Sequence, residues 1–191
     1  EYFELISETL IYVFFVMTFL LQSFVIPTGS MEDNILVGDH ILVDKVAYSP
    51  SLGALDGIMF PRQKIQRGMI VTFKSPKDLE KEYVKRVIGL PGETIRIVNK
   101  KVYIDGKPLD EPYTFFKDQL IEHSIRDNYP DYKVPENSYF CMGDNRDNSS
   151  DSRYWGPVPA DFIIGKPWRV YWSYDAPSRE YLDQRFWNKI K

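Results

Sequence analysis

The stretch from Phe24 to Met31 contains the residue best suited to nucleophilic chemistry. Ser30 follows Thr28 and Gly29 in a turn of small residues, directly after Pro27 and a long uncharged apolar run. A serine hydroxyl becomes a strong nucleophile only when a neighbouring base removes its proton. By itself such a turn is more typical of a linker, so a role for Ser30 depends on finding that base.

Histidine, the commonest base, is scarce in this sequence. Only His40 and His123 are present, and neither has metal-ligand spacing with a cysteine or another histidine. The pattern G-x-S-x-G is also absent, because Thr28 and Glu32 occupy the two glycine positions around Ser30. We therefore expect both histidines to be structural or surface residues, and a Ser-His-Asp triad has little support.

Lysine can replace histidine as the base when it is neutral at the start of the reaction. Free lysine titrates near ~10.4, and burial in an apolar site lowers that pKa. Lys85 lies in the middle of a predicted strand, where side chains alternate between faces and Arg86 must point away from it. A solvated edge strand is the alternative interpretation, and Lys45, beside Asp44, is a weaker candidate base.

A third stretch, 143–156, is dense in Asp, Asn, Ser and Arg. It does not fit a calcium-binding EF-hand loop, because Arg146 takes the third ligand position and no glycine stands at the sixth. Arginine and aspartate mixed in this way indicate a loop held by internal hydrogen bonds, and we call residues 143–156 the polar loop. Cys141, the single cysteine, excludes an intrachain disulfide and is expected to be buried and inert.

The N-terminal region is predicted to be a membrane anchor over residues 1–26. Thr9 to Ile26 carry no charge, and eighteen helical residues reach roughly 27 Å, close to the ~30 Å of a bilayer core. Acidic residues in place of a basic n-region argue against a cleavable signal peptide, and apolar residues all round argue against a core helix. Because the sequence begins with Glu1 rather than Met, we expect further residues upstream.

The rest of the chain is predicted to be mostly antiparallel β structure. There is no strand–helix–strand alternation, and glycine and proline turns separate many short strands. The expected strands are residues 39–46, 69–73, 83–88, 95–98, 101–104, 139–142, 163–164 and 169–172, with a hairpin turn at 99–100. We expect a catalytic β core over 27–106 and 136–174, an inserted smaller β subdomain over 107–135 and a peripheral tail over 175–191. An apolar loop at 52–60 could dip into a membrane surface.

The composition indicates a chain with a hydrophobic core and argues against one class of binding partner. The 191 residues are 43% hydrophobic, enough for one sizeable core. The net charge of −3 with interspersed signs argues against nucleic acid as the main partner.

Three motifs together resemble those of bacterial type I signal peptidases, membrane-bound Ser-Lys endopeptidases that remove signal peptides. They are Pro27 to Met31, Tyr83 to Gly92 and Gly143 to Gly156, and Gly165 to Trp172 is similar to the family's C-terminal strand. The resemblance covers residues from about Phe24 to Ser173. It implies a peptidase without a metal or organic cofactor.

The resemblance also implies roles for individual residues. Ser30 would be the acylating nucleophile, Lys85 its general base, and Ser149 the residue that orients Lys85. The Thr28 hydroxyl and the Ser30 amide would form the oxyanion hole. Two ion pairs, Arg86 with Asp144 and Asp151 with Arg153, would hold the base strand and the polar loop in register.

Small substrate residues at −1 and −3 would bind in pockets formed by apolar side chains. The positions that match are Phe24, Ile26, Met31, Ile35, Tyr83 and Val84. One departure stands out, because Glu32 and Asp33 place two carboxylates near Ser30 where the family usually has a variable residue and a proline. We expect both carboxylates to face solvent or lipid headgroups, since either one near Lys85 would stabilise its charged form.

The expected cellular context is a single pass through a plasma or thylakoid-type membrane, with the catalytic domain on the trans side. The partners would then be preprotein signal peptides, membrane lipid and the secretion translocon. One rival is a self-cleaving or regulatory Ser-Lys protease of similar fold. Another is a catalytically silent, membrane-tethered β module that binds peptides and needs neither Ser30 nor Lys85.

Overall fold

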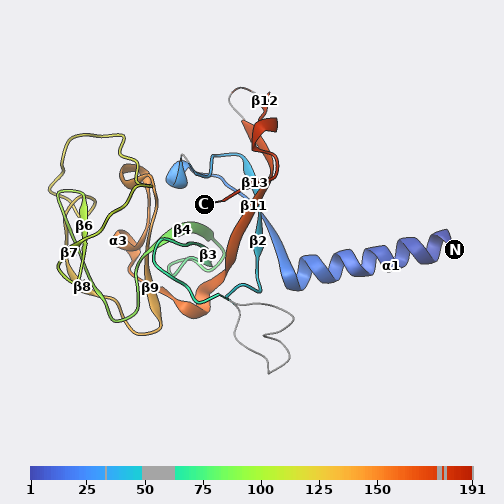
Figure 1. Cartoon of the computed structure of the whole chain (residues 1–191), viewed down its shortest axis with the longest axis horizontal. Coiled ribbons are helices and arrows are strands. Elements are labelled where there is room, and N and C mark those ends of the chain that lie inside the picture. Colours follow the sequence, from blue (N-terminus) through green and yellow to red (C-terminus); the bar gives the residue numbers. More distant parts are fainter. Residues whose placement is uncertain (33, 49–62, 176–177, 179, 191) are drawn as a thin grey trace.

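Two antiparallel sheets and one projecting helix make up the computed structural model, which describes residues 1–32, 34–48, 63–175, 178 and 180–190 (Figure 1). The larger sheet has the strand order β1-β2-β11-β3-β4-β9-β10, with β12 and β13 paired to β11. Its strands are β1 Leu21–Val25, β2 Asp39–Asp44, β3 Ile70–Lys74, β4 Glu82–Gly89, β9 Ser138–Met142, β10 Val158–Pro159, β11 Ile163–Asp175, β12 Glu180–Tyr181 and β13 Asn188–Lys189. The smaller sheet has the order β7-β6-β5-β8, from β5 Thr94–Val98, β6 Lys101–Ile104, β7 Lys107–Pro108 and β8 Tyr129–Lys133. The prediction of a mostly antiparallel β fold is confirmed.

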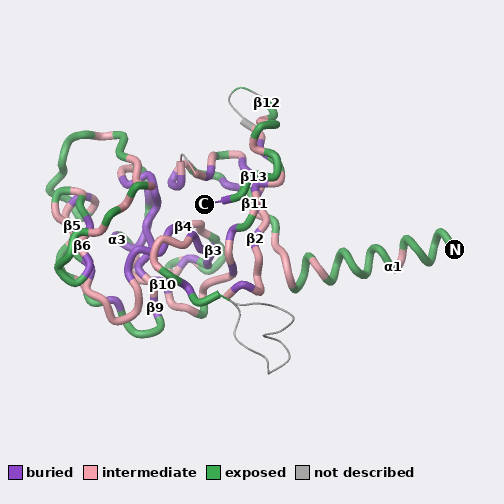
Figure 2. Tube along the Cα trace, viewed as in Figure 1, coloured by how far each residue is buried: buried purple, intermediate pink, exposed green. Residues whose placement is uncertain are grey.

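The N-terminal helix stands away from the sheets. Helix α1 spans Tyr2–Phe15 and continues into a π-helical turn, Val16–Leu20, and α1 buries none of its residues (Figure 2). Over Tyr2–Leu20 the chain is long and apolar enough to cross a membrane. The predicted helix was wrong beyond Leu20, because β1 pairs with β2 from Leu21 opposite Asp44 to Val25 opposite His40. An uncharged apolar run is compatible with a helix or with a strand, and here the pairing with β2 makes its last part a strand.

One long strand, β11, lies between β2 and β3 in the larger sheet. β11 replaces the two short strands expected at 163–164 and 169–172 and pairs with β2 and with β3 along different parts of its length. The expectation of a peripheral tail also needs correction, because β12 and β13 pair with β11 and Ile190 is only 9% exposed within the core. Arg185 of the tail donates to the buried Asp39 carboxylate.

The smaller sheet is built around the predicted hairpin. Asn99 and Lys100 have φ values of 49° and 68°, the left-handed conformation that a two-residue hairpin turn requires. β7 and β8, both from the expected insertion, pair on either side of this hairpin. The boundary expected between Gly106 and Lys107 therefore divides one sheet, because composition changes there while strand pairing does not.

Three clusters of buried apolar side chains form the core. The first packs under the turn that contains Ser30: Ile26, Met31, Ile35, Ile41, Val43, Ile70, Val170 and Ile190. The second joins the smaller sheet to β9: Ile88, Ile95, Ile97, Val102, Ile104, Val134, Phe140 and Met142. The third contains the fully buried Cys141: Ile65, Val71, Phe73, Val87, Cys141 and Val158. The apolar loop expected at 52–60 lies outside the described residues.

Candidate active site

Ser30 lies in a single 3₁₀ turn, Gly29–Met31, that follows β1. Met31, which is 2% exposed, and Ile26, which is 6% exposed, anchor the turn to the first core cluster. Pro27 and Gly29 break the strand between these two anchors. The turn therefore presents the Ser30 hydroxyl at the edge of the core, and the residue as a whole is 7% exposed.

Lys85 reaches Ser30 from the middle of β4. Its residue is 2% exposed, and its Nζ donates a hydrogen bond to Ser30 Oγ. Burial lowers the pKa of Lys85 to about 8, although the Asp151 and Asp144 carboxylates act in the opposite direction. With that pKa, roughly one Lys85 in ten is neutral at pH 7 and half are neutral at pH 8.

Two adjoining pockets meet at this pair of side chains. Thr28, Ser30, Tyr83 and Lys85 line both pockets. The first lies between the end of β1 and the start of β4 and is also lined by Phe24, Val25, Ile26, Pro27, Met31, Glu82 and Val84. The second extends over the polar loop and is also lined by Asp147, Asn148, Ser149, Ser150 and Tyr154. An extended peptide crossing from one to the other would pass over Ser30 Oγ.

Five of the six predicted substrate-binding side chains line the first pocket: Phe24, Ile26, Met31, Tyr83 and Val84. Ile35 is the exception. It is fully buried in the first core cluster and lines neither pocket, because the turn after Met31 directs it beneath the site. The sequence prediction missed Val25, Pro27 and Glu82, whose only signal is that they neighbour predicted pocket residues.

Arg86 and Asp144 form a buried ion pair behind the base strand. Arg86 Nε donates to Asp144 Oδ1 at 2.8 Å and Arg86 Nη2 donates to Asp144 Oδ2 at 2.6 Å. Arg86 Nη1 also donates to the Gly68 carbonyl, and its guanidinium lies 4.1 Å from the centre of the Tyr113 ring. Arg86 thus points to the opposite face of β4 from Lys85, as the strand alternation predicts.

Asp151 and Arg153 form a second buried pair. Arg153 Nε donates to Asp151 Oδ1 at 2.9 Å, and Arg153 Nη2 donates to Asp151 Oδ2 at 2.8 Å. Burial alone would raise the pKa of Asp151, but the Arg153 guanidinium reverses this and holds that pKa below its usual range. Asp151 also accepts from the Gly143 amide and caps helix α3, Ser152–Trp155.

Gly143 allows the polar loop to approach the nucleophile closely. A Cβ at this position would lie 2.4 Å from Ser149 Oγ and 2.5 Å from the Ser30 carbonyl oxygen. Ser149 is buried and lines the second pocket beside Lys85. Among the described contacts no hydrogen bond joins Ser149 to Lys85, so the orienting role of Ser149 stays a prediction.

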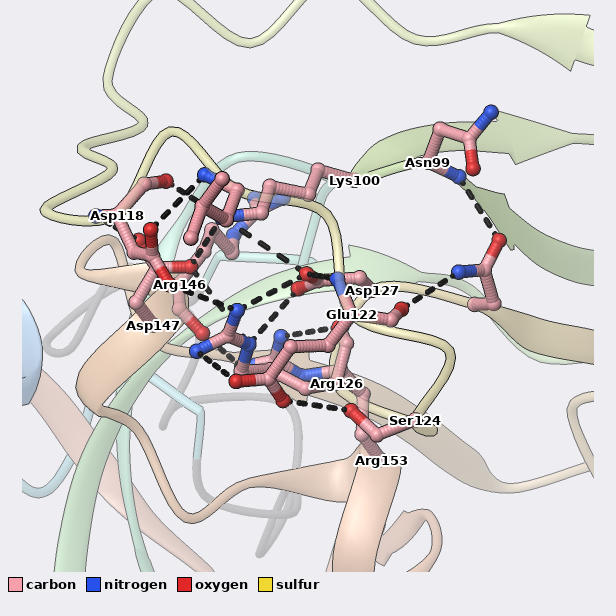
Figure 3. A network of polar contacts seen from close by, with 12 residues as sticks. Asn99, Lys100, Asp118, Glu122, Ser124, Arg126, Asp127, Arg146, Asp147 and Arg153 are labelled. Atoms are coloured by element: carbon pink, nitrogen blue, oxygen red, sulfur yellow. Dashed lines mark hydrogen bonds and ion pairs between the residues drawn. The ribbon is translucent and has the colours of Figure 1, made fainter.

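An ion-pair network connects the polar loop to the segment between β7 and β8 (Figure 3). Asp147 accepts from Lys100 Nζ at 2.9 Å and from the Asp118 amide at 2.8 Å. Arg126 pairs with Asp127, and the Arg126 carbonyl oxygen accepts from Arg153 Nη1. The sequence motif indicated such a loop, but its partners are distant in sequence and could not be named in advance.

Glu32 is partly exposed, as expected, but its carboxylate is also paired. Its Oε2 lies 2.7 Å from Lys117 Nζ and accepts from Asn145 Nδ2 at 3.0 Å. Asp33 lies outside the described residues.

The structure records no contact between Ser30 and either histidine. His40 stacks on Trp172, with ring centres 5.0 Å apart, and His123 is exposed. No group of three or more metal-ligating side chains occurs in the described parts of the chain.

A serine that accepts a hydrogen bond from a buried lysine, beside an apolar pocket, is the arrangement of a serine hydrolase whose base is lysine. Residues 1–172 match the family model described as "Signal peptidase, peptidase S26". The chain is 36% identical to "Signal peptidase I" of Pseudomonas fluorescens, over 95% of this chain and 75% of that protein. It is 30% identical to "Signal peptidase I" of Aquifex aeolicus, over 87% of this chain and 81% of that protein. A crystal structure of a signal peptidase I from Enterococcus faecalis matches 55% of this chain and 97% of its own, at 36% identity and a TM-score of 0.44.

The chain belongs to the signal peptidase family, peptidase S26. It is a serine endopeptidase that removes signal peptides, and its N-terminal apolar helix makes it a membrane-anchored protein.

Proposed function

We propose that Ser30 and Lys85 form the catalytic dyad of this peptidase. The observation that carries the proposal is the hydrogen bond from Lys85 Nζ to Ser30 Oγ in a buried site. A lysine with a pKa of about 8 can be neutral often enough to accept the serine proton near physiological pH.

The proposed reaction has two stages. Lys85 Nζ takes the hydroxyl proton as Ser30 Oγ bonds to the carbonyl carbon of the substrate, and the new oxyanion accepts from the Ser30 amide and the Thr28 hydroxyl. Lys85 then gives the proton to the departing amine, which leaves an acyl-enzyme on Ser30. In the second stage Lys85 deprotonates a water that attacks the acyl carbon, and Lys85 then returns this proton to Ser30 Oγ as the bond to the signal peptide breaks. Removing one oxyanion donor of this kind costs about 10²–10³ in rate.

The first pocket supports cleavage after small residues. Ile26 and Met31 are almost fully buried and line this pocket beside Ser30, so their apolar side chains support small, apolar substrate residues there. Phe24, Tyr83 and Val84 belong to the same apolar lining. We therefore assign the −1 and −3 substrate residues to this pocket and the residues after the cleavage site to the second.

We further propose that the catalytic sheets lie on the trans side of a plasma or thylakoid-type membrane, where a translocated preprotein emerges. Membrane lipid and the secretion translocon would then be neighbours of the enzyme. The position of Ser30 supports this, because only strand β1 and a short turn separate it from the apolar helix.

Cleavage of a preprotein with alanine at −3 and −1, in detergent or liposomes, tests the dyad. We expect wild-type protein to cut after the −1 alanine, Ser30→Ala and Lys85→Ala to be inactive while folded, and Lys45→Ala to keep full activity. Lys45 is a matched control because its Nζ binds the Thr18 carbonyl, outside the pockets. Residual activity in Lys85→Ala at the wild-type level would contradict the assignment of the base, and an inert wild type would favour the peptide-binding module.

A further inference from the structure

The turn that carries Ser30 is held from its far side by Asn145, which is fully buried. The Asn145 backbone amide donates to the Ser30 carbonyl oxygen at 3.1 Å. Its side-chain Nδ2 donates to the Gly29 carbonyl oxygen at 3.1 Å and to Glu32 Oε2 at 3.0 Å. Asn145 therefore holds the nucleophile turn at three points, one of which is the Glu32 carboxylate.

Glu32 folds back over the turn to make this contact. A Cβ added at Gly29 would lie 3.2 Å from Glu32 Oε2, which shows how closely the carboxylate packs against the turn. The same oxygen lies 2.7 Å from Lys117 Nζ. One carboxylate oxygen thus joins Asn145 and Lys117.

Lys117 belongs to the segment between β7 and β8, and backbone contacts bring that segment to the site. The Phe115 amide donates to the Asp144 carbonyl at 2.9 Å, and the Arg146 amide donates to the Phe115 carbonyl at 3.0 Å. This short parallel bridge between Phe115 and Asn145 places Lys117 beside the nucleophile turn. Lys117 also neutralises a carboxylate that would otherwise lie unpaired near the active site.

We propose that Glu32 is a positioning residue that, with Lys117, clamps the Ser30 turn to the segment between β7 and β8. The clamp fixes the Gly29 and Ser30 carbonyls through Asn145 and so sets the direction in which the Ser30 hydroxyl points. The proposal rests on Ser30 being the nucleophile.

A loss of activity can be separated from a loss of stability at this site. The Glu32 and Lys117 side chains are 36% and 51% exposed, and exposed ion pairs contribute little to stability. A change at Glu32 that slows catalysis while the Tm stays in place therefore reports on positioning.

The test compares Glu32→Ala, Glu32→Gln and the control Asp131→Ala in the full chain in detergent. Asp131 is the control because it forms an exposed ion pair with Arg96, at 3.9 Å, in the smaller sheet. For Glu32→Ala we expect kcat to fall about tenfold or more, with KM within about twofold and the Tm within about 2 °C of wild type, because a charge-assisted hydrogen bond in the turn is lost. Glu32→Gln keeps an oxygen that accepts from Asn145, so we expect kcat within about threefold of wild type. Asp131→Ala should match wild type.

Hydrogen exchange provides a second measurement that needs no substrate. The Asn145 amide, which donates to Ser30, should exchange faster in Glu32→Ala than in wild type or Glu32→Gln. A wild-type kcat in Glu32→Ala, or an equal loss in Glu32→Gln, would overturn the positioning role. An inert wild type would instead count against the peptidase dyad, and the exchange rates alone would then decide whether the clamp exists.

Discussion

Lys85 is the residue on which the proposed chemistry depends, and its burial works against the stability of the fold. An ammonium loses hydration when it is buried, and here that loss lowers the pKa to about 8. Asp144 and Asp151 favour the charged form of Lys85, but each is engaged by its own arginine. Because each carboxylate is paired with an arginine, it stabilises the charged form of Lys85 less than an unpaired carboxylate would.

Replacing Lys85 with methionine should therefore stabilise the protein at pH 7 while abolishing cleavage. The expected gain is up to about 3 kcal/mol, from the difference between the ordinary lysine pKa of about 10.4 and the folded value of about 8. Between about pH 8 and 10.4 the unfolded chain holds a proton that the folded chain lacks, so wild-type stability from this group rises with pH. The advantage of Lys85→Met should shrink across that window.

Urea unfolding at pH 7 and at pH 10, with Lys45→Met as the control, measures this difference. An equal stability of Lys85→Met and wild type at pH 7 would mean that the burial of Lys85 is not unfavourable.

At the scale of elements, the site is made where two parts of the larger sheet approach each other. β1 leads into the Ser30 turn, β4 carries Lys85 and the polar loop after β9 closes the second pocket. Gly143 sits at the contact between the loop and the turn, which is why its missing side chain matters.

Gly143→Ala should lower kcat about a hundredfold or more. The added methyl would meet the Ser30 carbonyl oxygen at 2.5 Å and displace the nucleophile or the loop, and displacements of about 1 Å can cost about 10²-fold in rate. Gly106→Ala is the control, since nothing lies within 4 Å of its Cβ and its φ of +77° tests backbone strain alone. Peptide cleavage and Tm are measured for both, and a Gly143→Ala enzyme with wild-type kcat would show that the contact is not needed.

Asp144→Ala should destabilise the protein by about 3–5 kcal/mol, because it leaves the buried Arg86 guanidinium without its carboxylate. Asp131→Ala, which breaks an exposed pair, should cost less than about 1 kcal/mol. Chemical denaturation gives both values. Similar small losses for the two variants would contradict a supporting role for the Arg86 pair.

At the scale of the whole molecule, helix α1 stands apart from the sheets. Helix α1 contributes no buried residue to the body of the protein and projects from it in Figure 1. Its apolar surface is explained by a lipid environment and not by packing in this chain.

Removing residues 1–20 should therefore release the protein from membranes without destroying its fold. We expect the full chain to float with liposomes in a density gradient and the shortened chain to stay in the soluble fraction. The shortened chain should still cleave a soluble peptide, since β1 begins at Leu21. Flotation of both forms to the same extent would place the membrane contact elsewhere on the surface.

The sequence predicted the parts of this fold that depend on local pattern. Alternation on β4 separated Lys85 from Arg86, and the turn at Asn99 and Lys100 was evident from its residues. The end of the helix at Leu20 was not predictable, because it depends on pairing with β2. The prediction that Ile35 lines the pocket was wrong, because the turn buries this side chain. The ion pair between Lys117 and Glu32 was not predictable either, because it joins residues far apart in the chain.

The pH dependence of kcat/KM for a peptide with alanine at −3 and −1 tests the central claim most directly. If Lys85 must be neutral to accept the Ser30 proton, activity should rise tenfold per pH unit at low pH and level off above about pH 8. An inflection near 10.4, the ordinary value for lysine, or near 6.5, the ordinary value for histidine, would contradict Lys85 as the buried general base.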